Sequence, residues 1–411
     1  MLDIKYIREN FDFVKKAAKD KGFATDFFDE LLEKDKQRRE ITSELDLLNG
    51  ERKKNTDREK GKELKESIRQ KEEKLTSVLD AYEQLMLRVP NPAAKDVKVG
   101  TPEENEIVRK VGDISKFDFP AKDHVEIAEL TDTLDLERGA KVAQSGFYYV
   151  KNEGVLLEQA LINYAIGKLI EKGFTPFITP NVAKEKNVVG CGYQARSDKE
   201  RQIYHIEGED LDLIGTAEIT LVGLHTNESI DEKSLPIKYA GISSCYRTEA
   251  GSYGKDVRGI IRVHEFRKIE MVVFCKPEES DLWHDKLLGI EEEIWKDLGI
   301  PYQVIKMATG DLGSAAARKY DIEAWMPSQN KYREVTSTSA TTDFQTRRLN
   351  IKAKIGGENI YPYTLNGTVL ALGRAMIAIM ENYQRKDGSF EIPKVLQKLV
   401  GKEIVEIKKT I

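Results

Sequence analysis

Cysteine, histidine and long apolar runs are scarce in this chain, and each scarcity excludes a class of protein. The three cysteines, Cys191, Cys245 and Cys275, form no C-x-x-C pair, which argues against a disulfide framework or zinc knuckle and favours a reducing compartment. The five histidines include no H-x-x-x-H pair, so a histidine-based metal site is unsupported. No apolar run approaches the ~20 residues of a membrane span, and residues 1–10 resemble no signal or transit peptide. We expect a cytoplasmic protein without membrane contact.

Proline is absent from residues 27–88, where charged residues are dense. Apolar residues recur there at steps of three, four and seven, in two runs with the spacing of a coiled coil. The runs are Leu31, Ile41, Leu45 and Leu48, then Leu64, Ile68, Leu75, Val78, Tyr82 and Leu85. Turn-forming residues from Gly50 to Gly61 place the reversal between the two runs. The pattern predicts two helices of ~28 residues, each ~42 Å long, paired as an antiparallel coiled-coil hairpin.

The segment before this hairpin is expected to be helical as well. In residues 1–22, apolar side chains recur at helical spacing, which predicts one short amphipathic helix. Thr25 or Asp26 is the expected N-cap of the long helix that follows.

Charge is distributed unevenly along the hairpin. The whole chain carries a net charge of −5, whereas residues 52–74 hold ten Lys or Arg and six Asp or Glu, a local net of 10 − 6 = +4. Such a patch is compatible with the solvated surface of a coiled coil, or with a contact to a phosphate backbone. Both interpretations stay open on charge alone.

The hairpin should end at Val89-Pro90-Asn91-Pro92, because two prolines stop a helix and stiffen the exit. A polar, irregular linker is expected to run to about Gly112, with a domain boundary near residue 105. The predicted domains are therefore 1–105 and 106–411. Beyond His124 the composition is that of a folded body of helices and strands, with a helix from Leu156 to Glu171 and a strand over 174–180 that closes on a proline.

One stretch of the body carries most of the chemistry, residues 245–270, CYRTEAGSYGKDVRGIIRVHEFRKIE. Alternating apolar residues at both ends predict two antiparallel strands. The glycine-rich, basic loop between them is too long for a tight turn and is expected to be functional. In this setting Arg247 can place two N–H groups on a phosphate, Phe266 can stack on a base, and Glu270 can accept from an amino group.

Three further segments carry candidate site residues. Residues 215–218, GTAE, follow a short apolar strand, and Glu218 beside a threonine hydroxyl can bind an ammonium group, although the pattern also suits a helix N-cap followed by an acid. Residues 331–339 predict a strand that runs into a hydroxyl-rich turn, where Glu334 and Ser337 offer oxygen ligands suited to Mg²⁺, although a solvated edge strand would fit the same residues. Residues 365–375 predict a strand, a turn and the start of an apolar helix.

Together these segments resemble the three motifs of class II aminoacyl-tRNA synthetases, and the whole chain resembles seryl-tRNA synthetases of the bacterial type. The segments that carry the resemblance are TAE at 216–218, YRTEAGSYGKDVRG at 246–259, YREVTS at 332–337 and LNGTVLALGR at 365–374. The resemblance implies an α+β fold: an antiparallel sheet flanked by helices, with an N-terminal helical hairpin as tRNA-binding arm. It also implies a homodimer formed through the motif around 156–180.

The resemblance further assigns roles to residues. The serine substrate is expected to contact Thr216, Ala217, Glu218, Arg247, Glu270 and Thr368. ATP is expected to contact Arg247, Thr248, Glu249, Val263, His264, Glu265, Phe266, Glu334, Val335, Thr336, Ser337 and Arg374. Mg²⁺ would be held by Glu334 and Ser337, and the catalytic residues would be Arg247, Glu334 and Arg374. The implied reaction is ATP-dependent formation of seryl adenylate and transfer of serine to tRNA(Ser), with tRNA(Sec) left open as a second acceptor and no DNA partner.

The chain departs from the usual family pattern at three places. Thr368 stands where the family usually has serine, His264-Glu265 stands where His-Gln is common, and Thr336 replaces a usual serine. Two alternatives to a seryl-tRNA synthetase are a paralogue that loads a carrier other than tRNA and a catalytically inactive RNA-binding relative. The basic hairpin argues against the first alternative. The required groups of the active site, all present, argue against the second: Arg247, Glu249, Glu270, Glu334 and Arg374.

Overall fold

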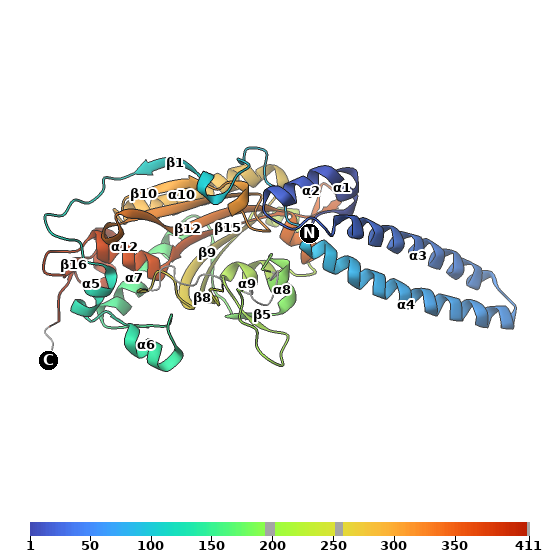
Figure 1. Cartoon of the computed structure of the whole chain (residues 1–411), viewed down its shortest axis with the longest axis horizontal. Coiled ribbons are helices and arrows are strands. Elements are labelled where there is room, and N and C mark those ends of the chain that lie inside the picture. The colour runs from blue at the N-terminus through green and yellow to red at the C-terminus, as the bar shows by residue number, and fades with distance from the viewer. Residues whose placement is uncertain (194–201, 251–257, 409–411) are drawn as a thin grey trace. The chain divides into compact units, whose positions relative to one another are not determined.

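The structure is a computed structural model that describes residues 1–193, 202–250 and 258–408. Internal contacts divide the chain into two compact units, Met1–Ala93 and Ala94–Ile411 (Figure 1). The division falls before the expected boundary near residue 105. Residues 94–105 belong to the second unit because they bind it directly: the amide of Ala94 donates to Ala317 O at 2.8 Å, and the Asn105 side chain donates to Asp311 at 2.8 Å.

The first unit is entirely helical in the residues described. Its helices are α1 (Ile4–Glu9), α2 (Phe11–Asp20), α3 (Phe28–Lys54) and α4 (Arg58–Arg88). The single helix expected over 1–22 is therefore two helices, separated at Asn10. Neither Thr25 nor Asp26 caps the next helix, because α3 begins after Phe27 without a side-chain cap. The aromatic rings of Phe27 and Phe28 are buried in the base of the hairpin, so packing decides where α3 begins.

The hairpin of α3 and α4 confirms the predicted antiparallel pairing. Its seam is formed by Ile41, Leu45, Ile68 and Val78, all buried. The reversal is shorter than expected and occupies only residues 55–57, while Gly50 and Gly61 lie inside the helices. The Asp57 carboxylate caps α4 by accepting from the amides of Glu59 and Lys60, which fixes the turn at this point.

An eight-stranded sheet organises the second unit, in the order β1-β10-β11-β12-β15-β9-β8-β4. Every neighbouring pair is antiparallel except β4 with β8. The strands are β1 (Glu106–Val111), β4 (Thr175–Ile178), β8 (Ile237–Tyr246), β9 (Glu265–Cys275), β10 (Tyr302–Lys306), β11 (Arg318–Met326), β12 (Lys331–Thr342) and β15 (Tyr363–Ala371). The presence of β1 corrects the expectation of an irregular linker to Gly112, since this exposed strand pairs with β10.

Helices pack on this sheet, and shorter strands form small additional sheets. The helices are α5 (His124–Thr131), α6 (Leu136–Ala143), α7 (Glu153–Glu171), α8 (Glu185–Gly190), α9 (Ala217–Gly223), α10 (Ser280–Asp297), α11 (Phe344–Arg348), α12 (Leu372–Asn382) and α13 (Lys394–Val400). The short strands are β2 (Leu134–Asp135), β3 (Tyr149–Val150), β5 (Val182–Ala183), β6 (Asp212–Leu213), β7 (Ser229–Asp231), β13 (Lys352–Ile355), β14 (Glu358–Ile360), β16 (Phe390–Glu391) and β17 (Ile404–Val405). Helix α10 packs against β12 and β15, and α9 packs against β8 and β9.

Most elements expected in the second unit are present. Helix α7 covers the predicted helix and begins three residues earlier, and β4 and β15 confirm the predicted strands. The hydroxyl-rich turn expected after residue 335 is wrong, because β12 continues as a strand to Thr342, paired on both sides with β11 and β15. Strands β8 and β9 pair antiparallel, with Tyr246 opposite Glu265. Residues 251–257 of the glycine-rich loop lie outside the described residues. None of the described helices is long and apolar enough to span a bilayer.

Candidate active site

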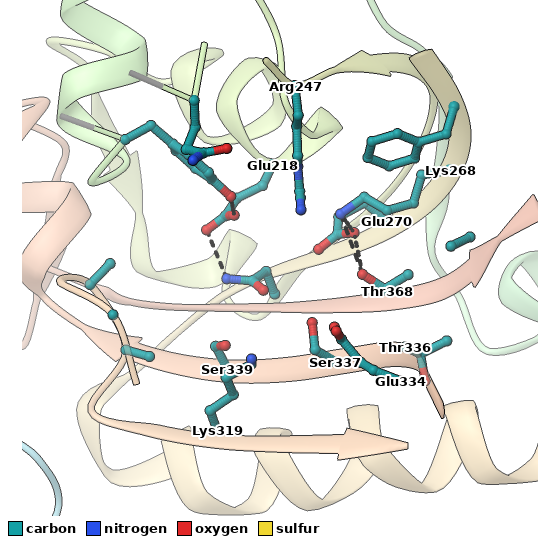
Figure 2. Close-up of a pocket in the computed structure, with 18 of the residues that line it drawn as sticks. Glu218, Arg247, Lys268, Glu270, Lys319, Glu334, Thr336, Ser337, Ser339 and Thr368 are labelled. Carbon is teal, nitrogen blue, oxygen red and sulfur yellow. Dashed lines mark hydrogen bonds and ion pairs between the residues drawn. The ribbon is translucent and has the colours of Figure 1, made fainter. Parts of the chain in front are cut away.

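A cavity of about 600 Å³ opens on the face of β9, β12 and β15, and most of the predicted site residues line it. Figure 2 shows Glu218, Arg247 and Glu270 turned toward one space, with Glu334 and Ser337 side by side on its floor. The predicted residues that line the cavity are Glu218, Arg247, Glu249, Val263, Phe266, Glu270, Glu334, Val335, Thr336, Ser337, Thr368 and Arg374.

Five predicted residues do not line the cavity; Ala217 and Thr248 are two of them. Thr216 is the N-cap of α9, where its hydroxyl accepts from the amide of Glu218. The imidazole of His264 bonds to Arg247 O at 3.0 Å and stacks on Phe147. The Glu265 carboxylate accepts from the Tyr246 hydroxyl at 3.1 Å, so it is held by a strand neighbour.

Arg247 directly follows β8 and carries its guanidinium into the cavity. The guanidinium carbon lies 5.3 Å from the centroid of the Phe266 ring, and Nη2 donates to Gly215 O at 3.3 Å. Because Phe266 is on the paired strand β9, the antiparallel register places cation and ring together. A half-buried, delocalised cation in a cavity suits a bidentate contact with phosphate or carboxylate.

Glu218 lies at the start of α9 and is held from three sides. Gln345 and Asn366 donate to its Oε1 at 2.6 and 2.7 Å, and the Tyr193 hydroxyl donates to Oε2 at 3.2 Å. Burial raises the pKa of Glu218 to about 7, and the nearby Glu270 adds to the rise. The carboxyl group is therefore close to its titration point at neutral pH, and a cationic partner would favour its charged form.

Glu270 forms a compact polar group with Lys268 and Thr368. The Lys268 ammonium lies 2.5 Å from Glu270 Oε2, and the Thr368 hydroxyl donates to the same oxygen at 3.0 Å. Lys268 and Glu270 are two residues apart on β9, and Thr368 is directly opposite Glu270 on β15. All three side chains are buried, so a substrate hydroxyl arriving here would meet donors and acceptors fixed in advance.

Glu334 and Arg374 form an ion pair in the wall of the cavity. Arg374, in the first turn of α12, lies 3.3 Å from Glu334 Oε2 and also donates to Glu334 O at 2.9 Å. Burial would raise the pKa of Glu334, but Arg374, Lys319 and Arg247 outweigh it and lower the pKa to about 2. An ionised carboxylate beside the Ser337 hydroxyl is a donor set that fits a hard divalent cation.

A third ion pair borders the cavity. Arg262 Nη1 lies 2.5 Å from Glu249 Oε2, and Glu249 has a left-handed backbone, φ 53°. A non-glycine residue in this region is uncommon, and such residues are enriched at functional sites.

Sequence reasoning missed several cavity residues. Lys268, Lys319 and Asn366 line the space, and Tyr193 borders it beside Glu218. A signal existed for Lys268, since residues i and i+2 of a strand share a face, and Asn366 belongs to a quoted segment. Gln345 reaches Glu218 from 127 positions away in the chain, and nothing in the local sequence indicates that contact.

Two family models match the chain. The seryl-tRNA synthetase N-terminal domain matches residues 1–93, the same span as the first unit. The tRNA synthetase class II core domain (G, H, P, S and T) matches residues 202–383, which hold all the catalytic residues predicted from the sequence.

Individual relatives are similar over the full length. A serine–tRNA ligase of Borrelia garinii subsp. bavariensis is 46% identical over 420 residues, covering 98% of both chains. Among solved structures, seryl-tRNA synthetase from Pyrococcus horikoshii complexed with ATP is similar with a TM-score of 0.92 and 39% identity, covering 100% of both chains. Cytoplasmic serine–tRNA ligase from Naegleria fowleri in complex with AMP has a TM-score of 0.88 and 32% identity, covering 100% of this chain and 99% of that one.

Proposed function

This chain belongs to the seryl-tRNA synthetase family, and from that premise we propose that it activates serine with ATP and transfers the serine to the 3′ end of tRNA(Ser). The observation that carries the proposal is that one cavity brings together the groups that serine and ATP require. Figure 2 shows the Arg247 side chain between the carboxylates of Glu218 and Glu270, with Glu334 on the cavity floor, and Arg374 is paired with Glu334. An amino acid bound by Glu218 and Glu270 and a polyphosphate bound near Glu334 and Arg374 would both reach Arg247.

Serine is proposed to bind at the end formed by Glu218, Glu270 and Thr368. Its ammonium would pair with the Glu218 carboxylate, which Gln345 and Asn366 already orient. Its hydroxyl would join the hydrogen bonds between Glu270 and Thr368, and its carboxylate would bind Arg247. Thr216 and Ala217 support this end indirectly, since Thr216 caps α9 and thereby places Glu218.

ATP is proposed to occupy the rest of the cavity, with its adenine on Phe266 near Glu249 and Val263. Arg247 would contact the α-phosphate, and Arg374 would clamp the γ-phosphate. The serine carboxylate oxygen then attacks the α-phosphorus, the bond to the β-phosphate oxygen breaks, and pyrophosphate leaves. The terminal ribose hydroxyl of tRNA next attacks the carbonyl carbon of seryl adenylate and releases AMP. No protein nucleophile is required, so the residues act by positioning and by charge stabilisation.

Mg²⁺ is proposed to bind Glu334 and Ser337, which are adjacent on the cavity floor. Within the described ranges no group of three or more His, Cys, Asp or Glu side chains could hold a metal by itself. Phosphate oxygens would therefore complete the coordination, as is usual for Mg²⁺. When bound, the cation would neutralise phosphate charge; the chain's own contribution is an ionised carboxylate kept in place by Arg374.

The helical hairpin is proposed as the tRNA-binding arm. The basic residues next to its turn are exposed. In the described part of the chain, Arg52, Lys53, Lys54, Arg58 and Lys60 make no ion pair, whereas Arg69 is paired with Glu66 and Glu73. Unpaired, exposed cations at the end of an arm suit a polyanionic partner. Contacts would be with phosphate and shape, because side chains reach bases in the deep groove of an RNA helix with difficulty.

A homodimer through α7 and β4 is proposed as the assembly. Strand β4 is an edge of the eight-stranded sheet. Ile178 on this strand is 86% exposed, and Leu156 and Ile170 on α7 are about half exposed. An apolar edge strand left in water favours pairing with another chain.

The cytoplasm is the compartment we propose, as expected from the sequence, because all three cysteines are free thiols and buried thiols persist in a reducing environment.

The test is serine-dependent ATP–pyrophosphate exchange, followed by transfer to tRNA. Exchange with serine should far exceed exchange with alanine, because alanine would leave the buried Glu270 and Thr368 without their partner. Threonine should also be rejected, since its methyl group would need room beside Thr368. A carrier-loading paralogue would exchange without charging tRNA, and an inactive relative would do neither. Charging of tRNA(Ser) and tRNA(Sec) in parallel settles the acceptor.

A further inference from the structure

A buried histidine connects three segments next to the nucleotide end of the cavity. His124, the first residue of α5, is 4% exposed. Its Nδ1 lies 3.3 Å from Glu381 Oε1, on the last turn of α12, and its Nε2 accepts from the amide of Ile260 at 3.1 Å. The other oxygen of Glu381 accepts from the amide of Ser328 at 3.0 Å.

These partners determine the tautomer of the imidazole. An amide N–H can only donate, so Nε2 must carry the lone pair. A carboxylate can only accept, so Nδ1 must carry the proton.

The contact at Ile260 bears directly on the cavity wall. Residues 260–263 line the cavity, and the Ile261 carbonyl accepts from Arg374 Nε at 3.4 Å. Arg374 and Glu381 are seven residues apart on α12, so they lie on one side of the helix, two turns apart. The backbone at Gly259 (φ +80°) passes so close to the imidazole that a Cβ at this position would lie 1.9 Å from His124 Nε2.

We propose that His124 is a positioning residue for ATP binding, acting through the backbone at 259–261. Glu381 orients the imidazole, the imidazole holds the Ile260 amide, and the adjoining Ile261 carbonyl aligns Arg374. Helix α12 thereby fixes two parts of the proposed ATP site: through Glu381 and His124 it holds the backbone that would contact adenosine, and it carries Arg374, which would bind the terminal phosphate. The inference rests on the proposed function, since it takes ATP as the occupant of this end.

Two substitutions of His124 test the roles of the two ring nitrogens separately. His124→Gln can keep an acceptor near the position of Nε2, whereas His124→Asn can keep a donor to Glu381 but leaves the Ile260 amide unpaired. Binding of ATP in the absence of serine, measured by titration calorimetry, isolates this end of the cavity. His225→Gln is the matched control. Its imidazole is also bonded at both nitrogens, to Glu228 at 2.8 Å and Tyr239 at 2.9 Å, and does not line the cavity.

We expect the Kd for ATP to rise about tenfold in His124→Asn, the usual effect of a buried donor left unpaired, and to change less than about twofold in His124→Gln and His225→Gln. The KM for serine at saturating ATP should stay unchanged in all three variants. Equal losses in the Asn and Gln variants, or none in Asn, would overturn the proposal. If His124→Asn does not fold, Glu381→Gln decides. The amide has one acceptor oxygen for the Nδ1–H of His124 and the N–H of Ser328, so the Kd for ATP should rise about fivefold, and an unchanged Kd would overturn the proposal. Wild-type protein that binds no ATP would contradict the proposed function instead.

Discussion

Individual carboxyl groups in the cavity differ in protonation because their neighbours differ. Glu218 and Glu334 are both held in the cavity wall, yet burial raises the pKa of the first to about 7, while three cations lower that of the second to about 2. The first can thus change charge near neutral pH, and the second stays ionised. This contrast matches one site for a transient cationic substrate and one for a permanent cation.

Replacing Arg247 by alanine should abolish adenylate formation without unfolding the protein. The guanidinium is proposed to contact both substrates, and loss of a transition-state contact commonly costs ~10²-fold or more in rate. Pyrophosphate exchange measures the effect, and circular dichroism measures the fold. Arg138→Ala, which removes an exposed arginine paired with Asp135, the N-cap of α6, is the control and should retain full exchange. Near-normal exchange by folded Arg247→Ala would contradict the site assignment.

The KM for serine should rise as the pH falls below about 7. In the free protein, burial raises the pKa of Glu218 to about 7, so acidification removes the charge that would bind the ammonium group. The KM of serine measured from pH 8 to pH 6 should increase several-fold, while the Glu218→Gln variant should bind serine weakly at every pH. A flat wild-type profile over this range would argue that another group holds the ammonium.

Helix α10 buries a carboxyl group, that of Glu291, where the helix packs on the sheet. Glu291 faces β12 and β15 and is fully buried. Neither of its oxygens makes a hydrogen bond of good geometry within the described residues, although the Thr336 hydroxyl is near. Burial raises the pKa of Glu291 well above its ordinary value, and Glu270 contributes to the rise. The native protein therefore holds a proton on this carboxyl group more tightly than the unfolded chain does.

Glu291→Gln should stabilise the protein increasingly as the pH rises. Because the folded-state pKa is raised, the stability that Glu291 contributes is fully present below the unfolded pKa of ~4.3 and is lost as the pH rises through the folded pKa. Melting curves at pH 5 and pH 8 should show a larger gain for the variant at pH 8 than at pH 5, about 1–2 °C for each ~1 kcal/mol of difference. Glu293→Gln, on the same helix but ion-paired with Lys168 and Lys172, should show no gain. Equal gains at both pH values would contradict the pKa argument.

The edge formed by α7 and β4 should carry the dimer contact. Ile178→Asp would place a charge in the proposed interface, where burying it without a partner is unfavourable, so the variant should be a monomer by light scattering at micromolar concentration. Leu282→Asp, at another exposed apolar position (54% exposed), should leave the mass unchanged. A wild-type protein of monomer mass would contradict the assembly itself.

At the scale of the whole molecule, we propose that the two units have separate tasks, serine activation in the second unit and tRNA binding in the first. The second unit contains every residue proposed for serine activation, and the first contains the basic hairpin. Replacing residues 40–70 by a short turn would shorten both arms together, since the reversal at 55–57 lies within this span. The variant should retain serine-dependent exchange and lose most tRNA charging at low tRNA concentration.

A finer variant removes charge and keeps the hairpin. Changing Lys53, Lys54, Arg58 and Lys60 to glutamine should weaken charging in the same way and reduce its dependence on salt. Unaffected charging in both variants would mean that the hairpin is a solvated coiled coil. Loss of exchange as well would mean that the hairpin supports the fold of the body and that the two units are not independent.

Local patterns were sufficient for much of this protein. Heptad spacing in a stretch without proline predicts the hairpin, because helix pairing depends on which residues share one face. Period-two alternation predicts β8 and β9 for the same reason. Short motifs also predicted twelve residues that line the cavity, since motif spacing and strand register bring them together. Propensity failed at Thr25 and Asp26, where burial of Phe27 and Phe28 determined the start of the helix.

Only the tertiary structure decided what depends on distant neighbours. The sequence of residues 106–111 does not reveal that they pair with β10, because pairing is a property of two strands. Gln345 on Glu218 and Glu381 on His124 are contacts across 127 and 257 positions. Burial and neighbouring charge also determine the protonation of Glu218, Glu291 and Glu334. Neither burial nor the charges nearby in space can be read from the order of residues in the chain. The sequence by itself thus determined which groups the site contains, while the fold decided which of them are charged, paired or held in place.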